Sequence, residues 1–466
     1  MPPPHPPAPL HREIPWRDPL ELFAVVAGDR HAALLHSAAD DGRGRHSLIA
    51  LEPFGVITGR DGATEVDGRR VPGSPFDALR AALARHATPR VPGLPPLQGG
   101  AVGVLGYELG RHLERVPLAP AAPDDAPEAG LLLCDVVVCL DNRARRAWIV
   151  SSGLPEADPA ARAARAAARL DHVEARLAAA RPLPPPPAPA AAPVIASGFT
   201  RASYEDAVRR VIDYILAGDV FQVNLSQRFT TALPAGLSPY DLFRRLQRAN
   251  PAPFGAYLAL GDTVVASSSP ERFLRLGDGR VETRPIKGTR PRGTTPDGDA
   301  ALAAELEASE KDRAENVMIV DLMRNDLSRV CRDGTVDVPQ LCAVERFATV
   351  MHLVSSVTGR MRDGLGAVDL LEACFPGGSI TGAPKIRAME IIAELEPVRR
   401  GPYCGAIGHA GWDGSLDTGI AIRTLVVRDG TVTFGAGGGV VADSDPAAEY
   451  EETLAKARAM VAALSP

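Results

Sequence analysis

The sequence predicts an α+β fold in which antiparallel β-sheets are flanked by helices. Two observations lead to this prediction: paired apolar runs around glycine turns recur along the chain, and a few long helical patterns lie between them. Hairpins outnumber strand–helix–strand units, which disfavours a doubly wound parallel sheet. At 466 residues the chain exceeds one ordinary core of about 100–200 residues, so we expect two or three units or one large double-layered domain.

The composition excludes several classes of protein. Hydrophobic residues make up 45% and charged residues 23% of the chain, which excludes disorder over the whole length. There are 51 basic and 57 acidic side chains, and the net charge of -6 offers no basic face for nucleic acid. The six cysteines form no C-x-x-C pair, the proline-rich start lacks the apolar run of a signal peptide, and no run of about 18 apolar residues occurs. We therefore expect a cytoplasmic protein without membrane or nucleic-acid partners.

The first part of the chain predicts a hairpin and one long helix. Leu131–Leu140 and Ala147–Ser152 are apolar runs separated by the polar turn DNRAR. The glycine-spaced segment Gly99–Gly110 lacks the context of a dinucleotide-binding loop and indicates close backbone packing. Pro159–Arg181 is rich in alanine and arginine and predicts a surface helix.

The domain boundary is predicted at a proline-rich segment. Pro182–Ala196 disfavours both helix and strand pairing and favours an extended spacer. We therefore expect an N-terminal region at 1–181, a linker at 182–197 and a catalytic region at 198–466.

The second part predicts three hairpins and three helices. The hairpins are Ala256–Ser267, Phe273–Arg284 and Thr424–Gly435. The first helix follows the capping pair Ser203 and Asp206 and ends at Gly218, the second covers Asp312–Val330, and the last begins at Pro446 after the cap Asp445.

Carboxylates on two of these helices are candidate ligands of a cation. Asp312 and Glu315 are three residues apart, and so are Glu449 and Glu452, with Lys456 one turn further on. Two such pairs facing each other suit Mg²⁺, which prefers oxygen ligands. The alternative is a solvated helix face with an ordinary salt bridge.

Lys287 is a candidate nucleophile because Arg284, Arg290 and Arg292 flank it. Neighbouring cations and desolvation lower the pKa of a lysine and favour the neutral amine. The alternative is a basic surface loop.

Three further segments bear on ligand binding. Gly377–Lys385 resembles a P-loop but has Ala383 and Pro384 where that motif requires lysine and serine or threonine, so nucleotide binding is not indicated. Gly435–Gly439 allow backbone N–H groups to approach an anion, with a sharp turn as the alternative. Arg423 interrupts an apolar, strand-like run, which predicts either an anion site or a structural ion pair.

A set of motifs over residues 200–462 resembles the chorismate-utilising enzymes related to anthranilate synthase component I. In chain order the motifs are SSSPERF, RPIKGT, EKDRAENVMIVDLMRNDL, FPGGSITGAPKIRAMEII, CGAIGHAG, IAIRTL, FGAGGGVVADS and EYEETLAKA. LLHSA, HSLIALEP and GGAVGVLGYELG resemble the N-terminal half of the family less specifically. The resemblance implies a sandwich of large antiparallel sheets with flanking helices.

Within the family, the likeness is greatest to the aminodeoxychorismate synthase branch, which serves para-aminobenzoate and folate synthesis. That branch has lysine in PIKGT, as Lys287 is here, whereas anthranilate synthases have alanine. Gln222 stands where isochorismate and salicylate synthases have a lysine base, which argues against addition of water to the ring. His36 stands where feedback-inhibited anthranilate synthases have glutamate, so inhibition by tryptophan is not implied.

The resemblance also implies roles for individual residues. Glu271 protonates the departing 4-hydroxyl of chorismate, and Lys287 attacks C2 before ammonia displaces it at C4, a transaminase-class amination. The implied Mg²⁺ ligands are Glu315 and Glu452 directly, and Asp312 and Glu449 through water. The implied substrate-binding residues are Thr289, His352, Ser379, Tyr403, Arg423, Gly437, Gly439 and Lys456.

No glutaminase nucleophile is recognisable in the chain, so the resemblance implies ammonia from a separate glutamine amidotransferase subunit in a heterodimer. Two alternatives remain: an anthranilate synthase component I of tryptophan synthesis, and a non-catalytic subunit that binds an amidotransferase.

Overall fold

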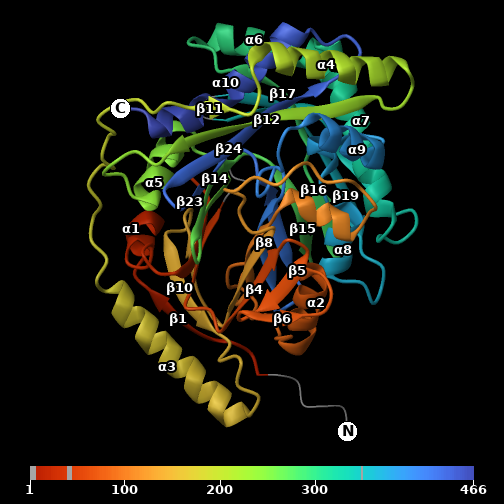
Figure 1. Ribbon diagram of the computed structural model, residues 1–466. Helices are drawn as coiled ribbons and strands as arrows, with labels where there is room; N and C mark the ends of the chain where they lie inside the picture. The colour runs from red at the N-terminus through yellow and green to blue at the C-terminus, as the bar shows by residue number, and fades with distance from the viewer. Residues whose placement is uncertain (1–6, 39–44, 348–349) are drawn as a thin grey trace.

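Two large antiparallel sheets face each other, and helices cover their outer faces in the computed structural model (Figure 1). The structure describes residues 7–38, 45–347 and 350–466. Within these residues each sheet has twelve strands. The predicted α+β sandwich is confirmed.

The first sheet runs from strand β1 at one edge to β11 at the other. Its strands, in order across the sheet, are β1 (Leu10–Ile14), β10 (Arg146–Ser151), β9 (Val136–Asp141), β3 (His46–Leu51), β2 (His31–His36), β13 (Phe254–Leu260), β14 (Thr263–Ser269), β23 (Thr424–Arg428), β24 (Thr431–Val440), β12 (Gln222–Ala232) and β11 (Ala196–Ser197), with β20 (Gly382–Ala383) paired to β12.

The second sheet runs from β17 to β6. Its strands, in order, are β17 (Ile286–Pro291), β19 (Val350–Arg360), β16 (Arg280–Thr283), β15 (Arg272–Gly277), β22 (Leu416–Ile420), β21 (Ala406–Gly411), β7 (Gly100–Leu105), β8 (Ala129–Cys134), β4 (Gly55–Arg60), β5 (Ala63–Val66) and β6 (Arg69–Val71), with β18 (Asp337–Arg346) paired to β19.

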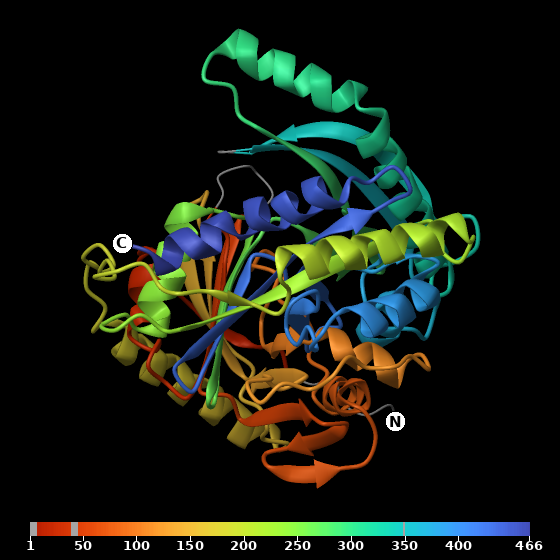
Figure 2. The ribbon, with the colours of Figure 1, turned by 45° about the horizontal axis from the view of Figure 1, so that its top comes forward.

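The helices are divided between the two outer faces and one end of the molecule. They are α1 (Pro19–Ala24), α2 (Pro75–Arg85), α3 (Pro159–Leu177), α4 (Arg201–Leu216), α5 (Pro239–Ala249), α6 (Pro296–Ala308), α7 (Glu310–Ser328), α8 (Ala367–Cys374), α9 (Lys385–Leu395) and α10 (Pro446–Leu464), with 3-10 helices η1 (Tyr107–His112) and η2 (Gly378–Ile380). Helix α6 lies beside β17 and β18 at the far end of the second sheet (Figure 2). None of the helices in the described residues is apolar over a length that could span a membrane.

Four apolar clusters follow from this layering in the described residues. One lies between the sheets and includes Leu48 and Val104. A second lies between the first sheet and helices α1, α3, α5 and α10, and a third packs helices that include α2, α4, α8 and α9 against the second sheet and β12. A small fourth cluster, with Leu306 and Leu353, lies between α6 and strands β18 and β19. Regions on both sides of 182–197 contribute strands to both sheets.

The three hairpins of the second part are confirmed as β13–β14, β15–β16 and β23–β24. The hairpin of the first part is only partly correct, because Leu131–Leu140 is not one strand. Residues up to Cys134 belong to β8 of the second sheet, and residues from Val136 belong to β9 of the first sheet, which pairs with β10. The buried Asp135 lies at this crossing between layers.

The helix predictions hold with one change of cap. Helix α4 begins earlier than expected because Thr200, not Ser203, is its N-cap, and the two side chains form a capping box. Asp445 caps α10 as predicted, with Pro446 in the first turn. The close backbone packing predicted for Gly99–Gly110 is present, since a Cβ on Gly103 would lie 1.9 Å from the Gly130 carbonyl oxygen.

Candidate active site

The predicted site residues gather where β17, β24, α7 and α10 meet the turn of η2. Helix α10 packs on β24, and α7 packs on β17 and η2. These elements lie at the same end of the molecule (Figure 1). Strand β17 brings an amine, β24 brings a run of glycines, and α7 and α10 both bring carboxylates.

Glu271 follows strand β14 and is fully enclosed, with 5% of its surface exposed. Burial raises its pKa to about 7, although a hydrogen bond with the Ser379 side chain and the charge of Lys287 act in the opposite direction. A carboxyl with this pKa holds its proton in a substantial fraction of molecules near neutral pH, as a general acid requires.

Lys287 lies on β17, and its Nζ donates to the backbone oxygen of Ser379 at 3.2 Å. Burial lowers the pKa of the amine; the charge of Lys456 adds to this, and Glu315 and Glu271 oppose it. Burial thus favours the neutral, nucleophilic form of the amine.

The arginines that flank Lys287 in the sequence are not the cause of this shift. Arg284 pairs with Glu345 at 2.5 Å, and Arg290 pairs with Glu305 at 2.7 Å and with Asp312 at 3.3 Å. Arg292 likewise pairs with Asp299, at 2.6 Å. The explanation from neighbouring arginines was therefore wrong, because carboxylates neutralise them.

The four candidate metal ligands come from two helices. Asp312 and Glu315 lie on α7, and Glu449 and Glu452 lie on α10. Burial raises the pKa of Glu315 and of Glu449, and the charge of Glu452 adds to both shifts. The two helices therefore bring their carboxylates into one electrostatic cluster.

Two lysines offset part of this negative charge. Lys456 Nζ lies 2.6 Å from Glu452 Oε1, and Lys311 Nζ lies 3.8 Å from Glu449 Oε1. For Glu452, burial is the largest single influence and opposes ionisation, but the charge and hydrogen bond of Lys456 together with the charges of Lys311 and Lys287 outweigh it, and the pKa is lowered.

The donor set fits a hard cation in its chemistry. Glu449 Oε1 accepts a hydrogen bond from the Ser444 hydroxyl at 2.7 Å, whereas Glu449 Oε2 is buried without a hydrogen-bond partner. A buried carboxylate oxygen in this position is suited to a metal ion. In the described part of the chain, no three His, Cys, Asp or Glu side chains are already arranged to hold a metal, so Mg²⁺ stays a prediction.

The glycine run of β24 borders this cluster. Gly435–Gly439 lie inside the strand, paired with β12, so the alternative of a sharp turn was wrong. A Cβ on Gly438 would lie 3.0 Å from Glu449 Oε2 and 3.2 Å from Glu452 Oε1, so a larger residue here would crowd both carboxylates. Lys456 Nζ donates to the Gly437 carbonyl oxygen at 2.8 Å. Beside Gly439 lies the side chain of Gln222, whose Oε1 is buried without a hydrogen-bond partner.

Arg423 does not lie in a strand, contrary to the sequence pattern. It occupies the junction between β22 and β23 with φ 53°, a left-handed conformation that turns the chain. Its Nη1 donates to the Lys456 carbonyl oxygen, and within the described residues no carboxylate lies within ion-pair distance. Burial lowers its pKa. The alternative of a structural ion pair is therefore not present, and the guanidinium is suited to an anion.

Three other predicted residues lie around the same space. Tyr403 is buried and packs against Gly435, where a Cβ would come within 2.4 Å of its ring. Thr289 and His352 face each other across β17 and β19, with 2.9 Å between Thr289 Oγ1 and His352 Nδ1.

Asn224 belongs to the site but was missed from the sequence. Its side-chain amide donates to the Ser379 carbonyl oxygen at 3.3 Å, so it holds the same turn as Lys287. It lies two residues after Gln222 on β12, and the two-residue period of a strand could have indicated a shared face.

Comparisons with known proteins agree on the family and not on the enzyme. A family model described as chorismate binding enzyme matches residues 31–462. The chain is 44% identical to anthranilate synthase component 1 of Streptomyces coelicolor, over 99% of this chain and 89% of that protein. It is 42% identical to aminodeoxychorismate synthase component 1 of Salmonella typhimurium, over 95% of each. The crystal structure of anthranilate synthase component I from Streptococcus pneumoniae is similar with a TM-score of 0.77 and 31% identity, over 90% of this chain and 92% of that chain.

Proposed function

The chain belongs to the family of chorismate-binding enzymes, and from this premise we propose that it converts chorismate and ammonia to 4-amino-4-deoxychorismate, a step of para-aminobenzoate and folate synthesis. The observation that carries the proposal is the half-buried amine of Lys287, hydrogen-bonded to Ser379 O at 3.2 Å and grouped with the buried carboxyl of Glu271. An amine in such a place is suited to attack an unsaturated ring.

The proposed reaction has two displacements. The neutral amine of Lys287 forms a bond to C2 of chorismate, both ring double bonds shift by one position toward C4, and the C4–oxygen bond breaks while Glu271 gives its proton to the departing hydroxyl, which leaves as water. Ammonia then bonds to C4, both double bonds shift back and the bond from Lys287 to C2 breaks. Glu271, now a carboxylate, is suited to take up the surplus ammonium proton.

The charged residues around this pair would hold the substrate. Arg423, Tyr403 and Lys456, with backbone amides at Gly437 and Gly439, are suited to bind the two carboxylates of chorismate. Thr289, His352 and Ser379 would lie near the ring. Glu315 and Glu452, with Asp312 and Glu449 through water, would hold Mg²⁺, which supplies positive charge beside the ring carboxylate.

The ammonia donor is proposed to be a separate glutamine amidotransferase subunit. Both relatives described above are named as component 1, which supports a second component. The isolated chain is then expected to use ammonium but not glutamine.

Anthranilate synthesis is the second candidate, since the relative from Streptomyces coelicolor carries that name at 44% identity. The two functions differ in where the amine enters and in whether the enolpyruvyl group is kept. A non-catalytic amidotransferase-binding subunit is disfavoured by the grouping of the half-buried Lys287 with the buried Glu271, which a binding role does not require.

One incubation tests these candidates. The pure chain is mixed with chorismate, Mg²⁺ and ammonium, and the product is identified by mass and by its conversion with an aminodeoxychorismate lyase. Aminodeoxychorismate is expected; anthranilate would favour the second candidate, and unconsumed chorismate would favour the third.

A further inference from the structure

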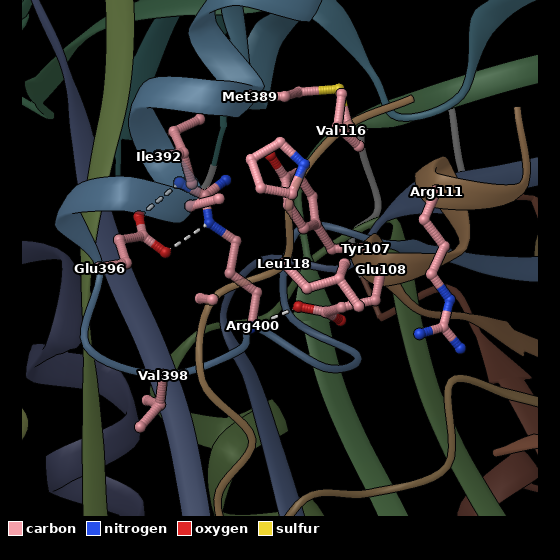
Figure 3. Close-up of a pocket in the computed structure, with 13 residues that line it drawn as sticks. Tyr107, Glu108, Arg111, Val116, Leu118, Met389, Ile392, Glu396, Val398 and Arg400 are labelled. Carbon is pink, nitrogen blue, oxygen red and sulfur yellow. Dashed lines mark hydrogen bonds and ion pairs between the residues drawn. The ribbon is translucent and has the colours of Figure 1, made fainter. Parts of the chain in front are cut away.

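Arg400 carries a guanidinium group that the surrounding chain encloses almost completely. Its side chain is 2% exposed, and that of its partner Glu396 is 4% exposed. Arg400 Nε and Nη2 donate to the two carboxylate oxygens of Glu396 at 2.9 and 2.6 Å (Figure 3). This two-point pairing compensates two charges that water cannot reach.

The remaining donors of Arg400 reach the backbone beside Ser379. Nη1 donates to the Ile380 carbonyl oxygen at 2.9 Å, and Nη2 donates to the Asn224 carbonyl oxygen at 2.6 Å. The Asn224 backbone N–H donates to the Thr381 carbonyl oxygen at 2.8 Å, and its side chain donates to Ser379 O. The guanidinium therefore joins β12 to the turn that carries Ser379.

Glu396 holds the same strand at a second position. Its Oε1 accepts hydrogen bonds from the Ser226 backbone N–H at 2.9 Å and from the Ser226 hydroxyl at 2.7 Å. Ser226 lies opposite Gly437 of β24. Glu396 therefore also holds β12 at Ser226, a residue of β12 that pairs with the glycine run of β24.

The segment that contains Arg400 is also anchored from the N-terminal half. The backbone N–H groups of Arg400 and Gly401 donate to the buried carboxylate of Glu108 at 2.7 and 3.0 Å. Figure 3 shows Glu108 and Glu396 on opposite sides of Arg400. Tyr403 follows in the same segment, so its place depends on these bonds as well.

Ser379 is the point at which this network meets the reacting groups. Its backbone oxygen accepts from Lys287 Nζ, and its side chain hydrogen-bonds with Glu271. Within the described residues, Arg400 donates no hydrogen bond to either of these two side chains. Arg400 can therefore influence their relative placement through the turn at Ser379.

We propose that Arg400 is a positioning residue, whose fork of donors fixes the peptide units around Ser379 and thereby the relative placement of Lys287 and Glu271. The proposal rests on the roles of these two residues in the proposed function. A residue that only stabilises the fold changes how much protein is folded, whereas a positioning residue changes turnover in the folded molecules. A misplacement of about 1 Å can lower a rate about a hundredfold.

Arg400→Lys tests this proposal, because lysine keeps the charge beside Glu396 but cannot supply the fork. Arg162→Lys is the matched control. Arg162 is also buried, and it donates from Nε to Ser152 O at 2.7 Å and from Nη2 to Thr88 Oγ1 at 2.9 Å. It lies on α3, at the opposite end of the molecule from β17 and α10 (Figure 1).

Both variants are compared with the wild type by thermal unfolding and by chorismate consumption with ammonium and Mg²⁺. We expect both to unfold at lower temperature. In Arg400→Lys, kcat per folded molecule is expected to fall about 30- to 100-fold with KM for chorismate changed less than about threefold. Arg162→Lys is expected to keep the wild-type kcat and KM.

A wild-type kcat in folded Arg400→Lys would overturn the proposal, and so would an equal loss of kcat in both variants. If Arg400→Lys does not fold, Ser226→Ala is measured in its place, because the alanine removes one hydrogen bond to Glu396 without removing a charge. A kcat about threefold below the wild type would support the proposal. An unchanged kcat would overturn it. Chorismate consumption is read separately from product identity. A wild type that makes anthranilate would therefore change the proposed function without deciding the role of Arg400.

Discussion

At the scale of single residues, burial acts in opposite directions on the two proposed reacting groups. It raises the pKa of Glu271 to about 7 and lowers the pKa of Lys287. Both shifts favour the uncharged forms, a carboxylic acid and a free amine. These are the forms that protonation of a leaving group and nucleophilic attack require, so one physical cause prepares both residues.

The covalent role of Lys287 predicts a specific pattern of loss. Lys287→Ala is expected to lower kcat for aminodeoxychorismate at least about a hundredfold, the scale for loss of one catalytic group, with a much smaller change in chorismate affinity. Lys287→Arg should not restore activity, because guanidinium stays charged. Wild-type protein quenched with chorismate but without ammonium should carry a mass adduct on the peptide that contains Lys287. Wild-type activity in the alanine variant would reduce Lys287 to a positioning cation.

The raised pKa of Glu271 predicts how stability depends on pH. The pKa of Glu271 rises from 4.5 in the unfolded chain to about 7 in the folded chain. The stabilisation that this shift provides is complete below pH 4.5 and is lost as the pH rises through about 7. Glu271→Gln cannot ionise, so between pH 5 and 8 it should lose less stability than the wild type. Thermal unfolding at four pH values measures the difference, with the exposed Glu65→Gln as control. Parallel curves for all three proteins would contradict the shift.

At the scale of elements, helices α7 and α10 hold carboxylates that repel one another close together. Each carries a pair of carboxylates three residues apart, and burial together with their mutual repulsion raises the pKa of Glu315 and of Glu449. Lys311 and Lys456 offset only part of the charge. A divalent cation bound here would remove this repulsion and satisfy the buried oxygen of Glu449.

The metal assignment predicts that Mg²⁺ stabilises the folded protein as well as supporting turnover. The melting temperature should rise with Mg²⁺ and fall back in excess chelator. Glu315→Gln and Glu452→Gln should each weaken the binding measured in this way by at least about tenfold, since loss of even an outer-shell group weakens metal sites about 10- to 100-fold. Glu310→Gln, an exposed charge change on the same helix, should match the wild type. Full turnover in excess chelator would rule out the assignment.

At the scale of the whole molecule, the two halves of the chain are interleaved. Strand β2 of the N-terminal half pairs with β13 of the C-terminal half, and β7 pairs with β21. Both sheets therefore lose central pairings if either half is absent. The segment 182–197 separates the two halves along the sequence, but strands from both halves pair within each sheet.

This interleaving predicts how the chain responds to cutting. Residues 198–466 expressed alone should aggregate or fail to unfold cooperatively, because the strand edges of β13 and β21 that pair with β2 and β7 are then exposed. A single protease cut engineered within 182–197 of the folded protein should leave the two fragments associated and the turnover unchanged. Circular dichroism and size-exclusion chromatography measure both outcomes. A stable, active fragment 198–466 would show that the catalytic region folds by itself.

The sequence predicted the local elements of the fold well. Two-residue alternation and glycine turns identified β13–β14, β15–β16 and β23–β24, and capping residues identified the start of α10. These features depend on neighbours a few residues apart, which the sequence presents directly. The error at Asp135 arose because β8 and β9 continue one apolar run, and only pairing with distant strands assigns them to different sheets.

The candidate residues of the site came from the sequence through the order of its motifs, and the family they indicated is the family that the comparisons identified. Tertiary structure alone decided what surrounds each residue. Lys287 was expected to owe its lowered pKa to desolvation together with Arg284 and Arg290. Burial is the largest cause, whereas those arginines pair with Glu345 and Glu305. Asn224 and Arg400 reach the turn at Ser379 from positions more than 100 residues apart, so no local pattern relates them. Burial and hydrogen bonding depend on which distant segments meet, and that is settled only when the two sheets close on each other.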